Sequence, residues 1–186
     1  MIDFIKTGIK LKDVDSFLRN LDSNGVKFEG IFVGNTFELT GEYQAKIKNI
    51  SVRIFPSRWL IISGSIHEYW NDGKHNYNDF TIQDFKIAID ELSKTVGINI
   101  WNLRIFTLEF NVNIKPPIPS SEILHNSFMH KRVAFRWASI TGEGTYYHCK
   151  HKEYYIKLYD KARQNELSYE LLRYEIYFKS EILNPK

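Results

Sequence analysis

Three stretches in the second half of the chain alternate between apolar and polar residues, and this pattern constrains the fold more than any other feature. They are residues 103–114, 154–161 and 171–179. Successive side chains of a β-strand point to opposite faces of the sheet, so each stretch predicts a strand with one apolar and one polar face. The polar sides would share a face if the strands are neighbours. That face would carry Glu109, Asn113, Lys157, Tyr159, Lys161, Arg173 and Glu175.

The remaining chain predicts further strands and helices. Turn residues, strand-forming residues and helical spacings set the expected limits. An opening strand over residues 1–11 precedes a short helix over 14–21. We expect strands within 27–33, 49–56, 58–66, 132–140 and 145–149, an exposed loop over 65–80, and a second helix over 120–128.

The clearest helix covers residues 82–96. Its apolar residues Ile82, Phe85, Ile89, Leu92 and Val96 recur at spacings of three and four. A capping-box pattern precedes it and a glycine follows it, which are typical limits of a helix. We expect its apolar face to pack on the strand at 103–114. The fold class is therefore α+β, with a central, mainly antiparallel sheet, helices mainly on one face and an open polar face.

Length and charge limit the alternatives. The 186 residues suit one domain that buries a core without metal or disulfides. A single cysteine, Cys149, cannot form an internal bridge, and together with the lack of a secretory signal it indicates a reducing cytoplasm. No apolar run is long enough for a membrane span. The net charge of +3 is too small to indicate a polyanion partner by itself.

The stretch GTYYHCKHKEYYIKLYDK, residues 144–161, is the most unusual part of the chain. It holds five tyrosines, four lysines, two histidines and the cysteine. Lysines in this region would form a positive stripe, which suits nucleic acid. A solvated strand face rich in tyrosine gives the same composition, so composition alone leaves both interpretations open.

Three segments in order resemble the landmarks of rolling-circle replication initiators. They are residues 106–113 with Leu108-Glu109, residues 144–164 with Tyr146 and Lys157 to Lys161, and residues 171–179 with Arg173-Tyr174-Glu175. The resemblance is to Rep_trans-type plasmid initiators and, more loosely, to filamentous-phage gene II nickases. It covers residues 103–179 and implies the palm of an HUH-type nickase, which nicks DNA at a replication origin through a covalent phosphotyrosine.

The resemblance also assigns roles to residues. The nucleophile would be Tyr146, with Tyr159 second and Tyr147 third, and Lys161 would assist at the phosphate. A phenol with an ordinary pKa near 10 needs a cation or a base nearby at neutral pH. Residues with hard oxygen ligands for Mg²⁺ or Mn²⁺ would be Glu109, Glu175 and Asn113. The expected DNA-binding residues are Lys150, Lys152, Lys157, Arg173 and Tyr147.

The chain departs from the family pattern at the metal-binding strand. Glu109 stands where the family usually has Asp, and Asn113 replaces a second Asp. Glu keeps a carboxylate, whereas Asn keeps an oxygen and loses the charge, which weakens cation binding. An imidazole ligand from His67 or His75 is a further candidate, although a lone histidine is more often an ordinary loop residue.

The resemblance implies origin DNA as the partner, single-stranded or as a cruciform. A host helicase and a second copy of the chain are further candidates, and no membrane is expected. Relatives commonly continue beyond the last strand, so residues 1–186 suggest one nuclease or nucleic-acid-binding domain that is either naturally short or taken from a longer protein. Two alternatives stay open: a non-catalytic module that binds single-stranded nucleic acid on the same sheet, and an interaction domain unrelated to nucleic acid.

Overall fold

A computed structural model describes residues 1–32, 39–140 and 144–179 of the chain. The described part is α+β, with one ten-stranded sheet in the order β2-β3-β4-β5-β1-β6-β12-β11-β10-β9 and one two-stranded sheet, β7-β8. All paired strands run antiparallel. The class predicted from the sequence is therefore confirmed.

The strands of the first half are β1 (Ile2–Lys10), β2 (Glu29–Phe32), β3 (Leu39–Ile47), β4 (Ile50–Ile54) and β5 (Trp59–Ser65). Those of the second half are β6 (Arg104–Ile114), β7 (Met129–His130), β8 (Val133–Ala134), β9 (Arg136–Ile140), β10 (Gly144–Lys150), β11 (Tyr154–Asp160) and β12 (Leu172–Lys179). The helices are α1 (Val14–Ser23), α2 (Ile66–Trp70), α3 (Ile82–Val96), the short 3-10 turn η1 (Ile100–Asn102), α4 (Ser120–His125) and α5 (Lys161–Gln164). None of these helices is long and apolar enough to cross a membrane.

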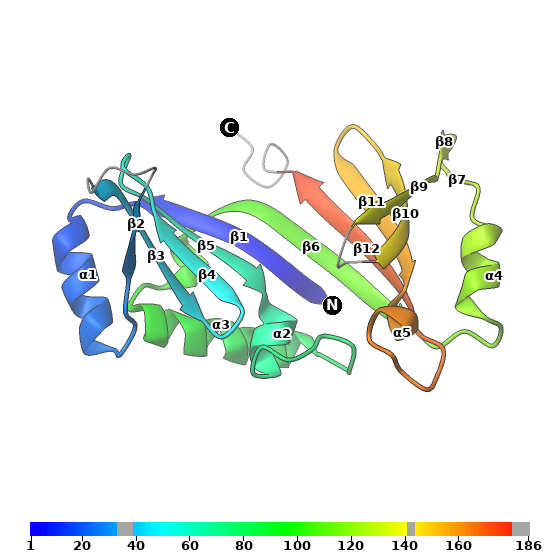
Figure 1. The fold of residues 1–186 in the computed structure, drawn as a ribbon, viewed down its shortest axis with the longest axis horizontal. Helices are drawn as coiled ribbons and strands as arrows, with labels where there is room; N and C mark the ends of the chain where they lie inside the picture. The colour runs from blue at the N-terminus through cyan, green and yellow to red at the C-terminus, as the bar shows by residue number, and fades with distance from the viewer. Residues whose placement is uncertain (33–38, 141–143, 180–186) are drawn as a thin grey trace.

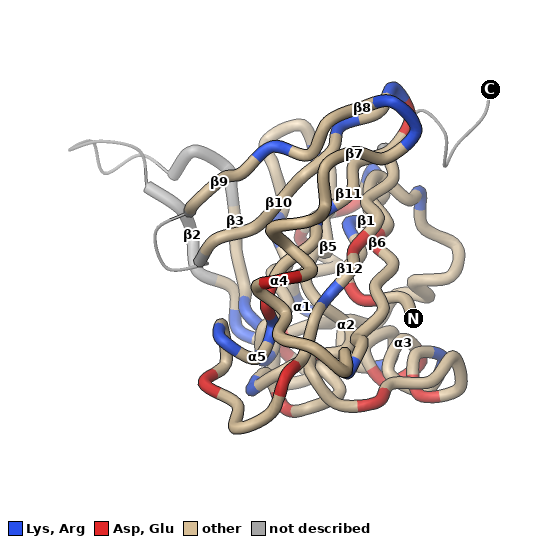
Figure 2. The backbone as a smooth tube through the Cα atoms, turned by 90° about the vertical axis from the view of Figure 1, so that its right-hand side faces the viewer, with Lys and Arg blue, Asp and Glu red and all other residues tan. Residues whose placement is uncertain are grey.

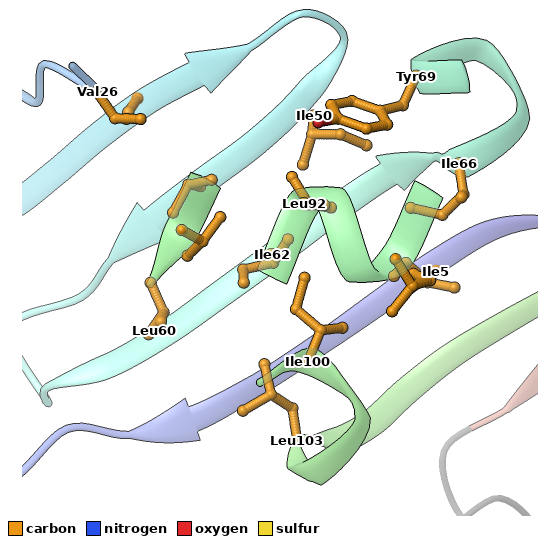
Figure 3. Packing of buried hydrophobic residues seen from close by; sticks show 14 of the residues in the cluster. Ile5, Val26, Ile50, Leu60, Ile62, Ile66, Tyr69, Leu92, Ile100 and Leu103 are labelled. Atoms are coloured by element: carbon orange, nitrogen blue, oxygen red, sulfur yellow. The ribbon is translucent and has the colours of Figure 1, made fainter. Parts of the chain in front are cut away.

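The main core lies between α1, α3 and the half of the sheet that contains β1 and β3 to β5 (Figure 1). Leu92 of α3 lies among isoleucines and leucines of β4 and β5, such as Ile50 and Ile62 (Figure 3). The predicted capping box of α3 is present, because Thr81 accepts a hydrogen bond from the Asp84 amide and Asp84 accepts one from Thr81. The alternating residues of β4 are buried in turn, as a half-buried strand requires.

The prediction that α3 packs on the strand at 103–114 was wrong. Leu108 is the residue of β6's apolar face that packs against the main core, while Phe110, Val112 and Ile114 are 37%, 53% and 42% exposed. Strands β1, β4 and β5 supply the surface under α3 instead. β1 lies between β5 and β6 because it pairs with both strands. Local periodicity in the sequence does not reveal this pairing.

Two short helices lie where the sequence predicted other structure. The expected exposed loop at 65–80 begins with α2, whose first turn is capped by the Ser65 hydroxyl. Five residues are too few to show a helical period. Lys161, expected on a strand, begins α5, which Asp160 caps by accepting from the Arg163 amide. β3 was not predicted at all.

Candidate functional site

The polar residues of three neighbouring strands share one face of the sheet. Strand β12 lies between β6 and β11, and residues that pair across strands point the same way. Arg173 lies opposite Asn113 on β6 and opposite Tyr159 on β11, and Glu175 lies opposite Lys157. The face carries Glu109, Asn113, Lys157, Tyr159, Arg173 and Glu175, as the alternation predicts.

This face is hollowed into a cavity of about 490 Å³. The strands supply one wall, and the segment after α2 (residues 71–80) and helix α5 supply the others. The lining residues are Asp3, Phe4, Ser65, Glu68, Lys74, His75, Asn76, Glu109, Tyr146, Lys157, Tyr159, Lys161, Gln164, Asn165 and Glu175. Acidic, basic and phenolic groups therefore meet in one concave site, which is typical of a functional pocket.

A fully buried arginine organises the floor of this site. Arg173 Nη1 lies 3.2 Å from Asp3 Oδ2 and 3.6 Å from Glu175 Oε1. Its Nε donates to Asn113 Oδ1 at 2.8 Å, and its Nη2 donates to the backbone oxygen of Asn76. These contacts join β1, β6, β12 and the segment after α2. Arg173 was predicted to contact DNA, but its 0% exposure places it beneath the surface.

Two carboxyl groups lie close together at the cavity wall. Burial, and then the neighbouring Glu175 carboxylate, raises the pKa of Glu109 to about 9. Lys157 Nζ lies 3.8 Å from Glu175 Oε2 and offsets part of this repulsion. A buried acid pair of this kind holds a proton or a cation between its oxygens. Mg²⁺ and Mn²⁺ prefer such oxygens and are often held by one or two carboxylates, so Glu109 and Glu175 fit a divalent ion.

The third predicted metal ligand lies elsewhere. Asn113 Oδ1 accepts the hydrogen bond from Arg173, and its Nδ2 donates to the Tyr77 carbonyl at 3.2 Å. The Asn113 amide therefore links β6 to the segment after α2. His75 does line the cavity, stacked on Tyr77 with ring centres 4.2 Å apart, and its Nδ1 is a buried nitrogen without a hydrogen-bond partner in the described part of the chain. His67 is fully buried and bonded to Asn78.

The candidate tyrosines occupy different environments. Tyr146 lines the cavity, with Lys157 Nζ 5.6 Å from its ring centre. The Tyr159 hydroxyl also faces the cavity but donates to Glu175 Oε1 at 2.7 Å, and burial followed by the Glu175 charge raises its pKa well above 10. Tyr147 pairs with Leu158 and packs on the small core of Leu158 and its neighbours, so it lies on the opposite face.

The lysines divide between the cavity and its surroundings. Lys157 and Lys161 line the cavity, and burial followed by the Arg173 charge lowers the pKa of Lys161 to about 8. Lys161 Nζ donates to Gln164 Oε1 at 2.9 Å. Lys150 lines a second hollow of about 370 Å³ together with Phe4, Tyr155 and Tyr177. Lys152 is exposed in the turn between β10 and β11.

Sequence reasoning missed the residues that β1 and α2 bring to the site. Asp3 is 4% exposed, lines the cavity and pairs with Arg173. It also accepts hydrogen bonds from the Ser65 hydroxyl and the Asn76 amide. A lone acid between the apolar residues Ile2 and Phe4 was the available signal, because a buried carboxylate needs partners.

Comparisons with known proteins identify a solved structure with a similar fold. No profile of a known protein family matches the sequence, and the search of curated proteins found no match. Among solved structures, the chain is similar to the rolling circle replication initiator protein from Geobacillus stearothermophilus, with a TM-score of 0.50 and 10% sequence identity. The similarity covers 98% of this chain and 77% of that one. The chain shares the fold of that initiator.

Proposed function

We propose that this protein initiates rolling-circle replication by nicking one DNA strand with Tyr146 in a reaction that needs Mg²⁺ or Mn²⁺. The observation that carries the proposal is the cavity itself, where Tyr146, two lysines and the Glu109–Glu175 pair meet. The shared fold with a replication initiator and the order of the three sequence motifs support the same function.

The cation would be held by Glu109 and Glu175, with water and a DNA phosphate at its other positions. When bound, it supplies positive charge that polarises the non-bridging phosphate oxygens. Its binding would replace the proton that the close carboxyl pair otherwise holds. His75 would add a nitrogen ligand from the segment after α2, since its Nδ1 has no hydrogen-bond partner among the described residues.

The residues of the chain bind and orient the phosphate. In the transfer, the Tyr146 phenolic oxygen forms a bond to phosphorus while the bond from phosphorus to the 3'-oxygen breaks. The phenolic proton leaves to solvent or a nearby base, and the 3'-oxygen receives a proton and becomes the primer hydroxyl. Lys157 stabilises the developing phenolate because its ammonium lies over the same ring. Lys161, with its pKa lowered to about 8, suits proton donation near neutral pH.

Tyr146 is favoured over the other candidates by its surroundings. The Tyr159 proton is engaged by a carboxylate, and the raised pKa of this phenol opposes phenolate formation. Tyr147 lies on the face away from the cavity. The ranking of Tyr146 before Tyr159 and Tyr147 therefore stands as part of the proposal.

A second function has an observation of its own. The hollow beside the cavity is lined by Phe4, Tyr155 and Tyr177, which offer rings for stacking unpaired bases. Asn113 stands where the family pattern has an Asp, and its oxygen accepts from Arg173, so the site has fewer acidic ligands than that pattern. A module that binds single-stranded DNA without cutting it would need only these features.

The experiment that separates the two functions is covalent capture. The protein is incubated with a random pool of stem-loop and single-stranded DNA in Mn²⁺ or in EDTA, denatured, and separated from free DNA. We expect a protein–DNA adduct in Mn²⁺ that EDTA and Tyr146→Phe abolish and Tyr159→Phe retains. Binding without an adduct under all conditions supports the non-catalytic module, and an adduct that Tyr146→Phe retains contradicts the assignment of the nucleophile.

A further inference from the structure

Three potential metal ligands meet on the side of β10 that faces away from the cavity. Nε2 of His151 lies 3.0 Å from Nδ1 of His130 and 3.2 Å from Sγ of Cys149. All three atoms lie within 4.8 Å of one another. Cys149 is fully buried, and the two histidines are half-buried. The β7–β8 hairpin and the end of β10 thus turn one thiol and two imidazole nitrogens toward a common point.

The alternation of β10 separates this cluster from the proposed nicking site. His148 pairs with Lys157, which lines the cavity, whereas Cys149 pairs with Ile156 on the opposite face. The cluster therefore serves neither the carboxyl pair nor Tyr146. Its ligand types also differ, since a thiolate and imidazoles select softer ions than the carboxylates that suit Mg²⁺.

The geometry is close to that of a zinc site. Zinc bonds of about 2.0–2.1 Å to nitrogen and about 2.3 Å to sulfur put tetrahedral ligand atoms roughly 3.3–3.6 Å apart. The separations of 3.0 and 3.2 Å need a widening of a few tenths of an ångström, and the third pair of ligand atoms, in His130 and Cys149, lies within 4.8 Å. The His151 ring is held by stacking on Tyr154, with ring centres 4.6 Å apart, which orients Nε2.

The hairpin that carries His130 needs such an attachment. β7 and β8 have two residues each, and a hairpin of this size is not stable alone. Lys131 and Arg132 form its turn with φ of 46° and 68°, a left-handed conformation that residues other than glycine adopt at a cost. Figure 2 shows basic residues at this turn. The Cys149 thiol already points at the hairpin, donating to the Val133 carbonyl at 3.4 Å.

We propose that His130, Cys149 and His151 bind one Zn²⁺ ion, with a solvent molecule as the fourth ligand, and that this ion fastens the β7–β8 hairpin to β10. On binding, the Cys149 thiol loses its proton to solvent and the thiolate bonds to the ion. Each histidine uses one ring nitrogen and keeps its proton on the other. The site fixes the basic turn of the hairpin relative to the sheet.

Cobalt substitution tests the site without any assay of nicking. The metal-free, reduced full-length protein is titrated with Co²⁺, whose thiolate complexes absorb in the near ultraviolet and whose tetrahedral complexes absorb strongly in the visible. We expect both bands to saturate at one Co²⁺ per chain and to disappear when Zn²⁺ is added. Absence of the thiolate band from the folded wild-type protein overturns the proposal.

Variants locate the site. Cys149→Ser should lose the thiolate band, and His151→Ala should lose the tetrahedral visible bands, while His125→Ala at the exposed end of α4 should keep both. The proposal is also overturned if Cys149→Ser keeps the thiolate band or if the tetrahedral bands are unchanged in His151→Ala. Circular dichroism tests whether each variant is folded. If a variant is not folded, the wild-type titration alone decides whether the metal site exists. Because the readout is metal absorption, this result is independent of whether Tyr146 forms a DNA adduct.

Discussion

The Tyr159 hydroxyl donates a 2.7 Å hydrogen bond to Glu175 Oε1 across the pair β11–β12. The same carboxylate oxygen lies 3.6 Å from Arg173, and the other oxygen lies 3.8 Å from Lys157. The phenol therefore belongs to the hydrogen-bond network that holds Glu175 in place. A tyrosine in this role supports the site structurally, which leaves Tyr146 as the proposed nucleophile.

Tyr159→Phe tests this division of roles. Removing the hydroxyl leaves a buried acceptor without its donor, so we expect the free energy of unfolding to fall by about 1–3 kcal/mol. The covalent adduct with DNA should persist. Urea denaturation and adduct capture provide the two measurements. Tyr146→Phe is the matched variant and should show the opposite pattern, with the adduct lost and about 1 kcal/mol or less of stability lost.

Glu109 makes the stability of the metal-free protein depend on pH. Its folded pKa of about 9 exceeds the ordinary value of 4.5, so the unfolded state binds fewer protons between these two values. The free energy of unfolding therefore falls as the pH rises, by at most about 1.4 kcal/mol per pH unit from this group. Glu109→Gln should flatten this slope and become more stable than wild type toward alkaline pH.

Urea denaturation in EDTA from mildly acidic to mildly alkaline pH measures this effect. Glu153→Gln, an exposed acid in the turn before β11, is the control and should follow wild type. Equal slopes for wild type and Glu109→Gln would show that Glu109 is ionised in the folded protein, contrary to the proximity of its carboxylate to Glu175.

Alternation in the sequence was sufficient to predict which residues share the polar face but not how deeply they are buried. The spacing of Arg173 and Glu175 placed both on one side of β12, and the register confirms this. Their burial depends on Asp3 and the segment after α2, which are about a hundred residues or more away along the chain. Such contacts arise from tertiary packing and leave no local period. The apolar side of β6 led to a wrong prediction for the same reason. Helix α3 was expected to cover this side, but Val112 on it is exposed.

Arg173 is predicted to be the most important single side chain for stability at the site. Arg173→Met removes the charge that pairs with Asp3 and Glu175, and an unpaired buried charge costs about 3–5 kcal/mol. Thermal or urea unfolding measures the loss. Arg163→Met on the exposed side of α5 should change stability by less than about 0.5 kcal/mol.

A second substitution checks the cause of that loss. Asp3→Asn removes one of the stranded charges, so the double variant with Arg173→Met should be more stable than Arg173→Met alone. If the double variant loses the sum of the two single effects, the two residues are independent and the ion pair at 3.2 Å contributes nothing.

Lys157 lies between the acidic pair and Tyr146, and in the proposed reaction it contacts the DNA phosphate, so its removal should weaken DNA binding in a salt-dependent way. It is half-buried, lies 3.8 Å from Glu175 and projects over the Tyr146 ring. A lysine that neutralises one phosphate adds about one unit to the slope of log affinity against log salt concentration. Lys157→Gln should therefore lower affinity for single-stranded DNA and reduce that slope by about 1, measured by filter binding at several salt concentrations. Lys86→Gln, exposed on α3, should leave the slope unchanged. An identical slope for Lys157→Gln and wild type would place the DNA backbone away from the cavity.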